Sequence, residues 1–297
     1  MNSMNQKPQK HSAPLTNAQV NDDLAAVNSS GLLEYRSDAL PTWCPGCGYY
    51  GIAHGLTQAL NSLNVDTKDL VVISGIGCAG RFPFFVNGYG FHSVHGRAVP
   101  IACGVKMARP DLTVLAVGGD GDGFGIGGGH IAHAIRRNVD VTYIIFDNGI
   151  YGLTKGQASP TTPVGQTTGT SPYGTVEDNL NPVLMCLSYG ASFLGTGYAG
   201  RPDELATLFR QAVDHKGFSM VIVTTPCITF DHVNITYDRF RDCWEPIPEE
   251  HDITDFKASV NLAMSGRFFS GVMFQSDRPD WESRQKQLRE TVLKNSS

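Results

Sequence analysis

The chain has 297 residues, of which 41% are hydrophobic, and it carries a formal net charge of −5. This length and apolar content are those of a globular protein with a substantial core, in one large domain or two small ones. The negative charge argues against binding to nucleic acid, and no apolar run approaches the roughly 20 residues that a membrane-spanning helix needs.

The N-terminal segment is polar and rich in Asn, Gln and Ser, with little apolar periodicity. We therefore expect a flexible extension over residues 1–38. It lacks the apolar centre of a secretory signal, which predicts a cytoplasmic protein. Thiols stay reduced in the cytoplasm, and the chain has seven cysteines, an odd number. Both observations argue against a framework of disulfides.

Strand and helix patterns alternate between residues 39 and about 240. Buried-strand patterns cover residues 70–77, 112–120, 141–148, 191–198 and 218–226. Helical patterns cover residues 54–63, 97–108, 131–138, 181–190 and 202–215. Short apolar runs separated by helices are typical of a parallel sheet that is covered on both faces. We predict a doubly wound, mostly parallel α/β domain over residues 39–240, with 218–226 as the last strand.

The remaining residues, 241–297, are predicted to form a C-terminal extension. It ends in the charged stretch WESRQKQLRETVLKN, residues 281–295. This composition is typical of a solvated helix. An arm that contacts a partner subunit is the alternative.

Residues with chemical potential gather where the predicted strands end. Gly77 and Cys78 follow the first strand, Asp120 the second, Asn148 the third and Cys227 the last. Doubly wound sheets bind ligands at the carboxyl ends of their strands. We therefore expect one site that draws on all of these positions.

The glycine-rich segment GDGDGFGIGGGH, residues 119–130, indicates a diphosphate site. Glycine lets backbone N–H groups approach phosphate oxygens, and the following helix contributes its positive end. Asp120 and the amide oxygen of Asn148, 28 residues later, suit a Mg²⁺ ion that bridges a diphosphate. GDG followed by Asn at this interval is the fingerprint of thiamine diphosphate. A turn that binds nothing and a nucleotide site are the alternatives. A nicotinamide site is disfavoured, because GxGxxG does not follow the first strand.

Four cysteines can converge: Cys44 and Cys47 in the loop WCPGCG, and Cys78 and Cys227 at strand ends. Four thiolates suit either zinc or an iron–sulfur cluster. Structural zinc usually takes two close CxxC pairs, whereas two of these ligands are single and far apart. Prolines beside Cys44 and Cys227 also recur at cluster sites. The spacing favours a cluster and leaves zinc open. The remaining cysteines are expected to be buried, inert thiols: Cys103, Cys186 and Cys243.

Several long segments together resemble the β subunit of 2-oxoacid:ferredoxin oxidoreductases, and most closely its 2-oxoglutarate (KorB-like) branch. The resemblance covers roughly residues 38–240. The segments that carry it are WCPGCGYYGI, SGIGCAGRFPFF, HGRAVPIACGVK, GGDGDGFGIGGGH, RRNVDVTYIIFDNGIYGLTKGQASPT and the late PC.

The resemblance implies a cofactor set and its ligands. It implies a [4Fe–4S] cluster on Cys44, Cys47, Cys78 and Cys227. It implies thiamine diphosphate held through Mg²⁺ on Asp120, Asn148 and the backbone carbonyl of Ile150. The positions that would line the cofactor are Ile76, Gly77, Cys78, Ala79, His95, Gly121, Asp122 and Leu153.

The family oxidises a 2-oxoacid with CoA to an acyl-CoA and CO₂ and passes the electrons to ferredoxin. Its β subunit works with an α subunit, which predicts an (αβ)₂ heterotetramer. The distal carboxylate of 2-oxoglutarate needs a cation, and we expect Lys155 and Arg81 near the cofactor mouth. His92 is expected to serve packing.

Three alternative functions share parts of this pattern. Pyruvate or broad 2-oxoacid specificity is one, and a zinc-stabilised subunit that binds a diphosphate without catalysis is another. A cluster-free thiamine decarboxylase is disfavoured, because such chains carry two cofactor-binding domains and are much longer than 297 residues.

Overall fold

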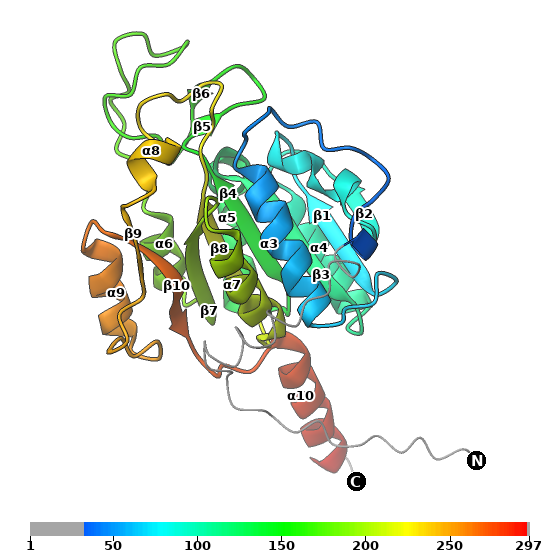
Figure 1. Ribbon diagram of the computed structural model, residues 1–297. Coiled ribbons are helices and arrows are strands. Elements are labelled where there is room, and N and C mark those ends of the chain that lie inside the picture. Colours follow the sequence, from blue (N-terminus) through cyan, green and yellow to red (C-terminus); the bar gives the residue numbers. More distant parts are fainter. Residues whose placement is uncertain (1–32, 296–297) are drawn as a thin grey trace.

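The computed structural model describes residues 33–295 of the chain. The strands in this part are β1 (Leu70–Ser74), β2 (Tyr89–His92), β3 (Thr113–Gly119), β4 (Thr142–Asp147), β5 (Ile150–Tyr151), β6 (Gln157–Ala158), β7 (Phe193–Tyr198), β8 (Ser219–Thr224), β9 (Trp244–Pro246) and β10 (Phe268–Gln275). Eight of them form one sheet in the order β2, β1, β3, β4, β8, β7, β10, β9 (Figure 1).

Neighbouring strands in this sheet are parallel, except for β7 and β10. The antiparallel strands β5 and β6 form a separate two-stranded ribbon beyond the upper edge of the sheet in Figure 1. The prediction of a mostly parallel α/β domain is confirmed.

Helices cover both faces of the sheet. The helical elements are α3 (Tyr49–Ser62), η1 (Ala79–Phe85), α4 (Ala98–Ala108), η2 (Gly121–Ile126), α5 (Gly128–Arg137), α6 (Pro182–Ser188), α7 (Pro202–Asp214), α8 (Tyr237–Phe240), α9 (Phe256–Met264) and α10 (Trp281–Asn295). In Figure 1, α3 and α7 lie in front of the sheet, and α4, α5 and α6 lie behind it.

The two faces bury separate apolar cores, as the continuous apolar strands predict. On β4, Ile144 and Phe146 pack into the core under α3 and α7. Tyr143 and Ile145, the alternate residues, pack into the core under α4 and α5. A strand with both faces covered must be apolar throughout, and every residue of β4 is buried.

The sheet extends beyond the strand that the sequence placed last. β10 pairs with β7, with Gly271 opposite Thr196, and β9 pairs with β10. The expectation that the strand over 218–226 ends the sheet is therefore wrong. β10 was missed because Ser270 and Gly271 interrupt its apolar run. The domain boundary near residue 240 stays a prediction, but the chain on both sides of it shares one sheet.

The packed chain begins earlier than expected. Of the predicted flexible extension, 1–38, residues 1–32 lie outside the described part. Tyr35 is only 3% exposed, and its hydroxyl donates to the carbonyls of Leu60 and Val65 at 3.1 and 2.7 Å. Placing Tyr35 in a flexible extension is thus wrong. One aromatic residue in a polar segment gives no periodic signal from which its burial could be predicted.

No side chain of the last helix, α10, is fully buried, and Trp281 at its start packs partly buried against the core under α4 and α5. This agrees with a solvated helix, and the partner-contacting arm stays a prediction. Among the described residues, no helix combines the length and the apolar character needed to cross a bilayer.

Candidate functional site

A pocket of about 480 Å³ lies beside the carboxyl ends of β1, β3 and β4. Its walls come from the loop after β1, the turn after β3 and the segment after β4 that carries β5 and β6. It brings together eleven of the residues singled out in the sequence: Ile76, Gly77, Cys78, Ala79, His95, Asp120, Gly121, Asp122, Asn148, Ile150 and Leu153.

Asp120 and Asn148 lie side by side at the inner end of this pocket. Each follows a strand, and β3 and β4 are paired neighbours. Asp120 is 1% exposed, and its Oδ1 accepts the backbone N–H of Asn148 at 3.3 Å. The Asn148 side chain donates to the hydroxyl of Tyr49 at 3.1 Å, and its Oδ1 accepts the Ile150 N–H at 3.1 Å. Parallel strand ends therefore place the predicted magnesium ligands together.

A second buried carboxylate, which the sequence did not single out, lies beside Asp120. The hydroxyl of Thr161 is 2.9 Å from Asp120 Oδ2 and 2.7 Å from Asp147 Oδ1. A hydroxyl has one hydrogen, so it donates to only one of them at a time. Burial raises the pKa of Asp120, and burial with the nearby Asp120 charge raises the pKa of Asp147 to about 7.

This carboxylate pair suits a divalent cation. Within the described chain, no Lys or Arg lies at ion-pair distance from either acid. Two buried carboxylates without a cation repel one another, and a bound Mg²⁺ would compensate both charges with hard oxygen ligands. Thr161 gave no sequence signal because a long loop brings it back to the site. Asp147 could have been noticed, since it directly precedes Asn148 at a strand end.

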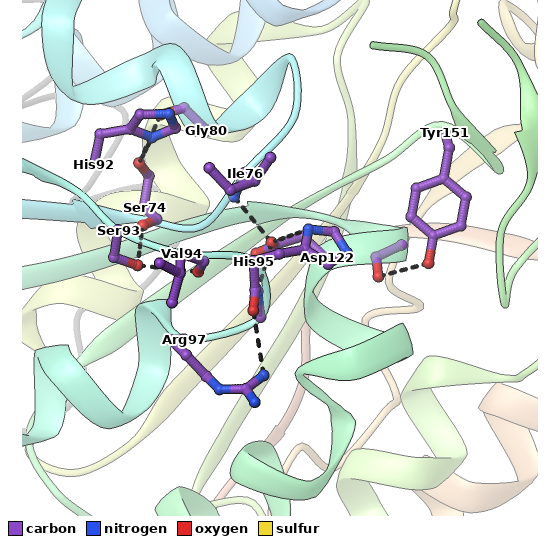
Figure 2. Close-up of polar contacts among 12 residues, drawn as sticks. Ser74, Ile76, Gly80, His92, Ser93, Val94, His95, Arg97, Asp122 and Tyr151 are labelled. Carbon is purple, nitrogen blue, oxygen red and sulfur yellow. Dashed lines mark hydrogen bonds and ion pairs between the residues drawn. The ribbon is translucent and has the colours of Figure 1, made fainter. Parts of the chain in front are cut away.

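Asp122 joins three segments of the pocket wall. It is 2% exposed, and its Oδ1 accepts the N–H groups of Ile76 at 2.9 Å and Gly96 at 2.8 Å. His95 Nδ1 lies 3.0 Å from the same oxygen (Figure 2). Burial raises the pKa of Asp122, and these two N–H donors oppose that effect. The sequence placed Asp122 beside the cofactor but did not predict these contacts.

The glycines of the turn after β3 allow a close approach of Tyr151. η2 is a single turn of π type, a rare geometry that is frequent at functional sites. The Tyr151 hydroxyl donates to the Gly121 carbonyl at 3.0 Å, and a Cβ on Gly121 would overlap the Tyr151 ring. Any larger residue at Gly121 would therefore displace a wall of the pocket.

The four cysteines of the predicted cluster gather next to the pocket. The sulfurs of Cys78 and Cys227 lie 3.9 and 3.6 Å from the position of a Cβ on Gly152, so both face this glycine. Thr229, in the segment that follows β8, donates to Cys44 Sγ at 3.2 Å. All four thiols are free. The structure thus brings together residues that are up to 183 positions apart.

Their thiols are electrostatically coupled. Burial, with smaller contributions from the other three cysteines, Cys227, Cys78 and Cys44, raises the pKa of Cys47 to about 12. Burial also raises the pKa of Cys78 and of Cys227. In the part of the chain that the structure describes, no group of three or more His, Cys, Asp or Glu side chains is placed to hold a metal ion.

The remaining cysteines only partly follow expectation. Cys186 is fully buried and Cys103 is partly buried, and burial raises the pKa of each thiol to about 12. Cys243 is exposed, so its prediction as a buried thiol is wrong. It follows the short surface helix α8, where its Sγ lies 2.9 Å from the Arg239 carbonyl.

Arg81 and Lys155 do not line the pocket. Arg81 donates to Thr42 Oγ1 at 3.2 Å, and its charge lowers the pKa of the Cys78 thiol against the larger effect of burial. It therefore lies on the cysteine side. Lys155 is exposed, directly after pocket-lining residues, and has a backbone φ of 87°. His92 is also outside the pocket, with Nδ1 3.0 Å from Ser74 Oγ (Figure 2).

Comparison with known proteins identifies this architecture. Residues 75–223 match the family model "Thiamine pyrophosphate enzyme, C-terminal TPP binding domain". Residues 227–290 match the model of the C-terminal part of the pyruvate ferredoxin oxidoreductase beta subunit. The β subunit of a 2-oxoacid:ferredoxin oxidoreductase from Sulfolobus sp is 41% identical, over 82% of this chain and 85% of that protein. The chain belongs to the 2-oxoacid:ferredoxin oxidoreductase β subunits.

Other relatives place it within that family. A 2-oxoacid:ferredoxin oxidoreductase β subunit from Aeropyrum pernix is 45% identical over 68% of this chain, and the match spans 65% of the relative. The solved 2-oxoglutarate:ferredoxin oxidoreductase from Magnetococcus marinus, with 2-oxoglutarate, coenzyme A and succinyl-CoA bound, is 43% identical. It superposes with a TM-score of 0.86 over 90% of this chain and 92% of that chain. The predicted family and its thiamine-diphosphate-binding fold are confirmed.

The geometry around Asp120 predicts the effect of removing its carboxylate. Asp120→Ala should abolish Mg²⁺-dependent binding of thiamine diphosphate, because the buried oxygen beside Asn148 is lost. Iron content should stay unchanged, since the four cysteines belong to other segments of the chain. Calorimetric titration of the cofactor, with metal analysis of the same sample, measures both. Asp111→Ala, at an exposed acid remote from the pocket, is the matched control. Normal cofactor affinity in Asp120→Ala would contradict this assignment.

Proposed function

We propose that this chain is the β subunit of a 2-oxoglutarate:ferredoxin oxidoreductase. The enzyme would convert 2-oxoglutarate and CoA to succinyl-CoA and CO₂ and pass electrons through a [4Fe–4S] cluster to ferredoxin. The observation that carries the proposal is the position of four cysteines next to a thiamine-diphosphate pocket. The named activity of the Magnetococcus marinus neighbour supports 2-oxoglutarate over pyruvate.

Three groups of this chain would hold the cofactor's metal. Asp120, the Asn148 amide oxygen and the Ile150 carbonyl supply hard oxygen ligands at adjoining positions of the pocket. The buried acid beside them, Asp147, adds negative charge that a cation offsets. Thr161 lies between the two carboxylates and can donate to either one. Bound thiamine diphosphate would supply the nucleophilic carbon and the electron sink that decarboxylation of a 2-oxoacid requires.

The cysteine set fits a cluster by its chemistry. Metals bind the thiolate form of cysteine. The raised pKa values of Cys47, Cys78 and Cys227 make these thiolates unfavourable on their own, and a bound metal would stabilise them. In a [4Fe–4S] cluster each thiolate binds its own iron, so the four sulfurs surround a volume instead of one point. One zinc ion needs all four sulfurs at about 2.3 Å from a single centre. A cluster would supply one-electron transfer beside the cofactor pocket.

Lys155 is our candidate for the distal carboxylate of 2-oxoglutarate. Its backbone lies in the left-handed region at φ 87°, which is unfavourable for any residue but glycine, Asn or Asp. Such strain clusters at functional sites, where surrounding structure maintains it. The segment from Gly152 to Thr154 lines the pocket directly before it. Arg81, on the cysteine side, is better placed to offset cluster charge than to bind substrate.

The pocket needs a partner subunit. Activation of thiamine diphosphate requires a glutamate on its aminopyrimidine ring, and the lining residues of this pocket include no glutamate. Apolar side chains are exposed on and beside the pocket rim: Ile76, Val94, Ile126 and Leu153. We infer that this rim is covered by the α subunit, which brings the glutamate and completes an (αβ)₂ enzyme. α10 stays a candidate contact for that subunit. The cytoplasmic location also stays a prediction.

The cluster assignment is tested by a pair of serine substitutions. Cys227→Ser should lower iron content and abolish reduction of ferredoxin or a viologen, because an alcohol is a poor ligand for iron. Cys186→Ser should do neither, since Cys186 is buried in α6, in the core on the other face of the sheet from Cys47 and Cys78. Metal analysis and anaerobic assays of the complete enzyme measure both effects. Unchanged iron in Cys227→Ser would remove Cys227 from the ligand set.

The substrate assignment is tested at Lys155. Lys155→Ala should raise the KM for 2-oxoglutarate by roughly ten- to a hundredfold, the usual effect of losing a charge-assisted contact. The KM for pyruvate, which has no distal carboxylate, should change little. Lys68→Ala, at an exposed lysine before β1, is the control. Equal effects on the two substrates would place Lys155 at the shared carboxylate or at the cofactor.

A further inference from the structure

Helix α4 presents only apolar or small residues to the surface. Its sequence, AVPIACGVKMA, contains one charged residue, Lys106, and that side chain is buried. The Lys106 ammonium donates to the Leu112 carbonyl at 2.7 Å and lies 3.0 Å from Asp140 Oδ2. The exposed positions of the helix follow one another at intervals of four: Pro100, Gly104 and Ala108. A surface helix normally turns polar side chains toward water, so this face is typical of one that another protein covers.

The end strand β2 extends this apolar surface. β2 pairs only with β1 within the described chain, and all four of its residues are exposed (Figure 1). Tyr89 and Phe91 pair with Val71 and Ile73 of β1, which pack into the core under α4 and α5. Paired residues point to the same face of a sheet, so Tyr89 and Phe91 lie on the α4 side. They are 60% and 52% exposed, and natural proteins usually cover an apolar edge of this kind.

Gly104 lies at the centre of the exposed face of α4. Glycine inside a helix is less favourable than alanine. Packing within the described chain does not require it, because no heavy atom outside its own part of the helix lies within 4 Å of a Cβ placed there. The distance between two packed helices depends on the side chains at their contact. A glycine at this position would let a second helix approach closely.

The place of this face in the molecule indicates what covers it. α4 has 11 residues and is about 16 Å long, too short to span a bilayer. Its N-terminal end lies at the pocket rim: a Cβ on Gly96 would overlap Ile126, so this rim residue packs against the loop that leads into α4. Val94, in the same loop, is also exposed. The apolar surface therefore continues from α4 to the rim of the pocket, which needs a partner subunit.

We propose that the α4 face, formed by Pro100, Gly104 and Ala108 with Tyr89 and Phe91 of β2, is a docking surface for the α subunit. An apolar helix of that subunit would cross α4 at Gly104. The inference rests on the proposed αβ enzyme and names where its two subunits meet. The α-subunit helix would carry small or apolar side chains at the crossing, because the exposed side of α4 offers no group that could pair with a charge.

The test measures assembly of the full β chain with the α subunit by analytical ultracentrifugation over a dilution series. Gly104→Leu and Gly104→Glu should each raise the dissociation constant by about ten- to a hundredfold, since either side chain overfills the crossing and Glu also buries a charge. The β chain itself should fold as before, because the space beside Gly104 is open and both residues are better helix formers than glycine.

The controls are Asn261→Leu and Asn261→Glu, at an exposed position inside α9, which should leave assembly unchanged. Iron content and the thermal midpoint of the β chain report its own fold. If the Gly104 variants do not fold, Pro100→Glu replaces them, since an acid in the first turn of a helix favours that helix.

Each outcome decides the question. Normal assembly of the variants would overturn the proposal. A β chain that self-associates without α, loses this in Gly104→Leu and still binds α normally would assign the face to a second copy. A lower midpoint in the variants, matched by removal of residues 1–32, would assign it to that segment. Either result overturns the proposal. Turnover of 2-oxoglutarate by the wild-type chain without any α subunit would instead refute the proposed αβ enzyme.

Discussion

Four parallel strands, β1, β3, β4 and β8, end at the same edge of one sheet, and the rest of the site depends on this constraint. The chain leaves the edge through Cys78, Asp120, Asn148 and Cys227 within a few residues of the last paired position. No local sequence feature brings these four together, since they are spread widely along the chain. Parallel pairing alone does so, and it places the proposed ligands of a magnesium ion and of a cluster beside one pocket.

The same edge concentrates groups that are costly to bury. Asp120, Asp122 and Asp147 are each at most 9% exposed, and burial raises the pKa of all three. The cysteines beside them are subject to the same effect. Such groups persist when bound cations or donors stabilise their charged forms. The described residues supply N–H groups and one histidine to Asp122. For Asp120 and the cysteines, the metal cofactors would supply the compensation.

The sequence was sufficient for features that depend on local pattern. The buried strands read as apolar runs, and the residues directly after them could be placed because strand ends share an edge. Features that depend on long loops were missed. Thr161 returns to Asp120 over 41 residues, and β10 joins β7 after a gap of about 70 residues. Arg81 was expected near the cofactor mouth, and its contacts with Thr42 and Cys78 could not be predicted, because spacing does not give the direction of a side chain.

Hydrogen-bond partners were the other feature that the sequence did not predict. Asp122 reads as part of a glycine-rich diphosphate turn, and nothing in that turn predicts that its carboxylate binds two distant loops. The burial of Tyr35 and of Cys243 was also predicted wrongly, in opposite directions. An isolated aromatic residue in a polar segment is in the core, and a cysteine near apolar neighbours in the sequence is at the surface. Single residues outside a periodic pattern take their burial from tertiary packing.

The presence of an iron–sulfur cluster next to the cofactor pocket is the central claim about this molecule. It is tested most directly by metal and acid-labile sulfide analysis of the anaerobically purified enzyme, together with its visible spectrum. We expect about four iron and four sulfide per β chain and a brown protein with broad absorption that bleaches on reduction. One zinc per chain, with neither iron nor sulfide, would contradict the claim and leave a zinc-stabilised subunit that binds a diphosphate.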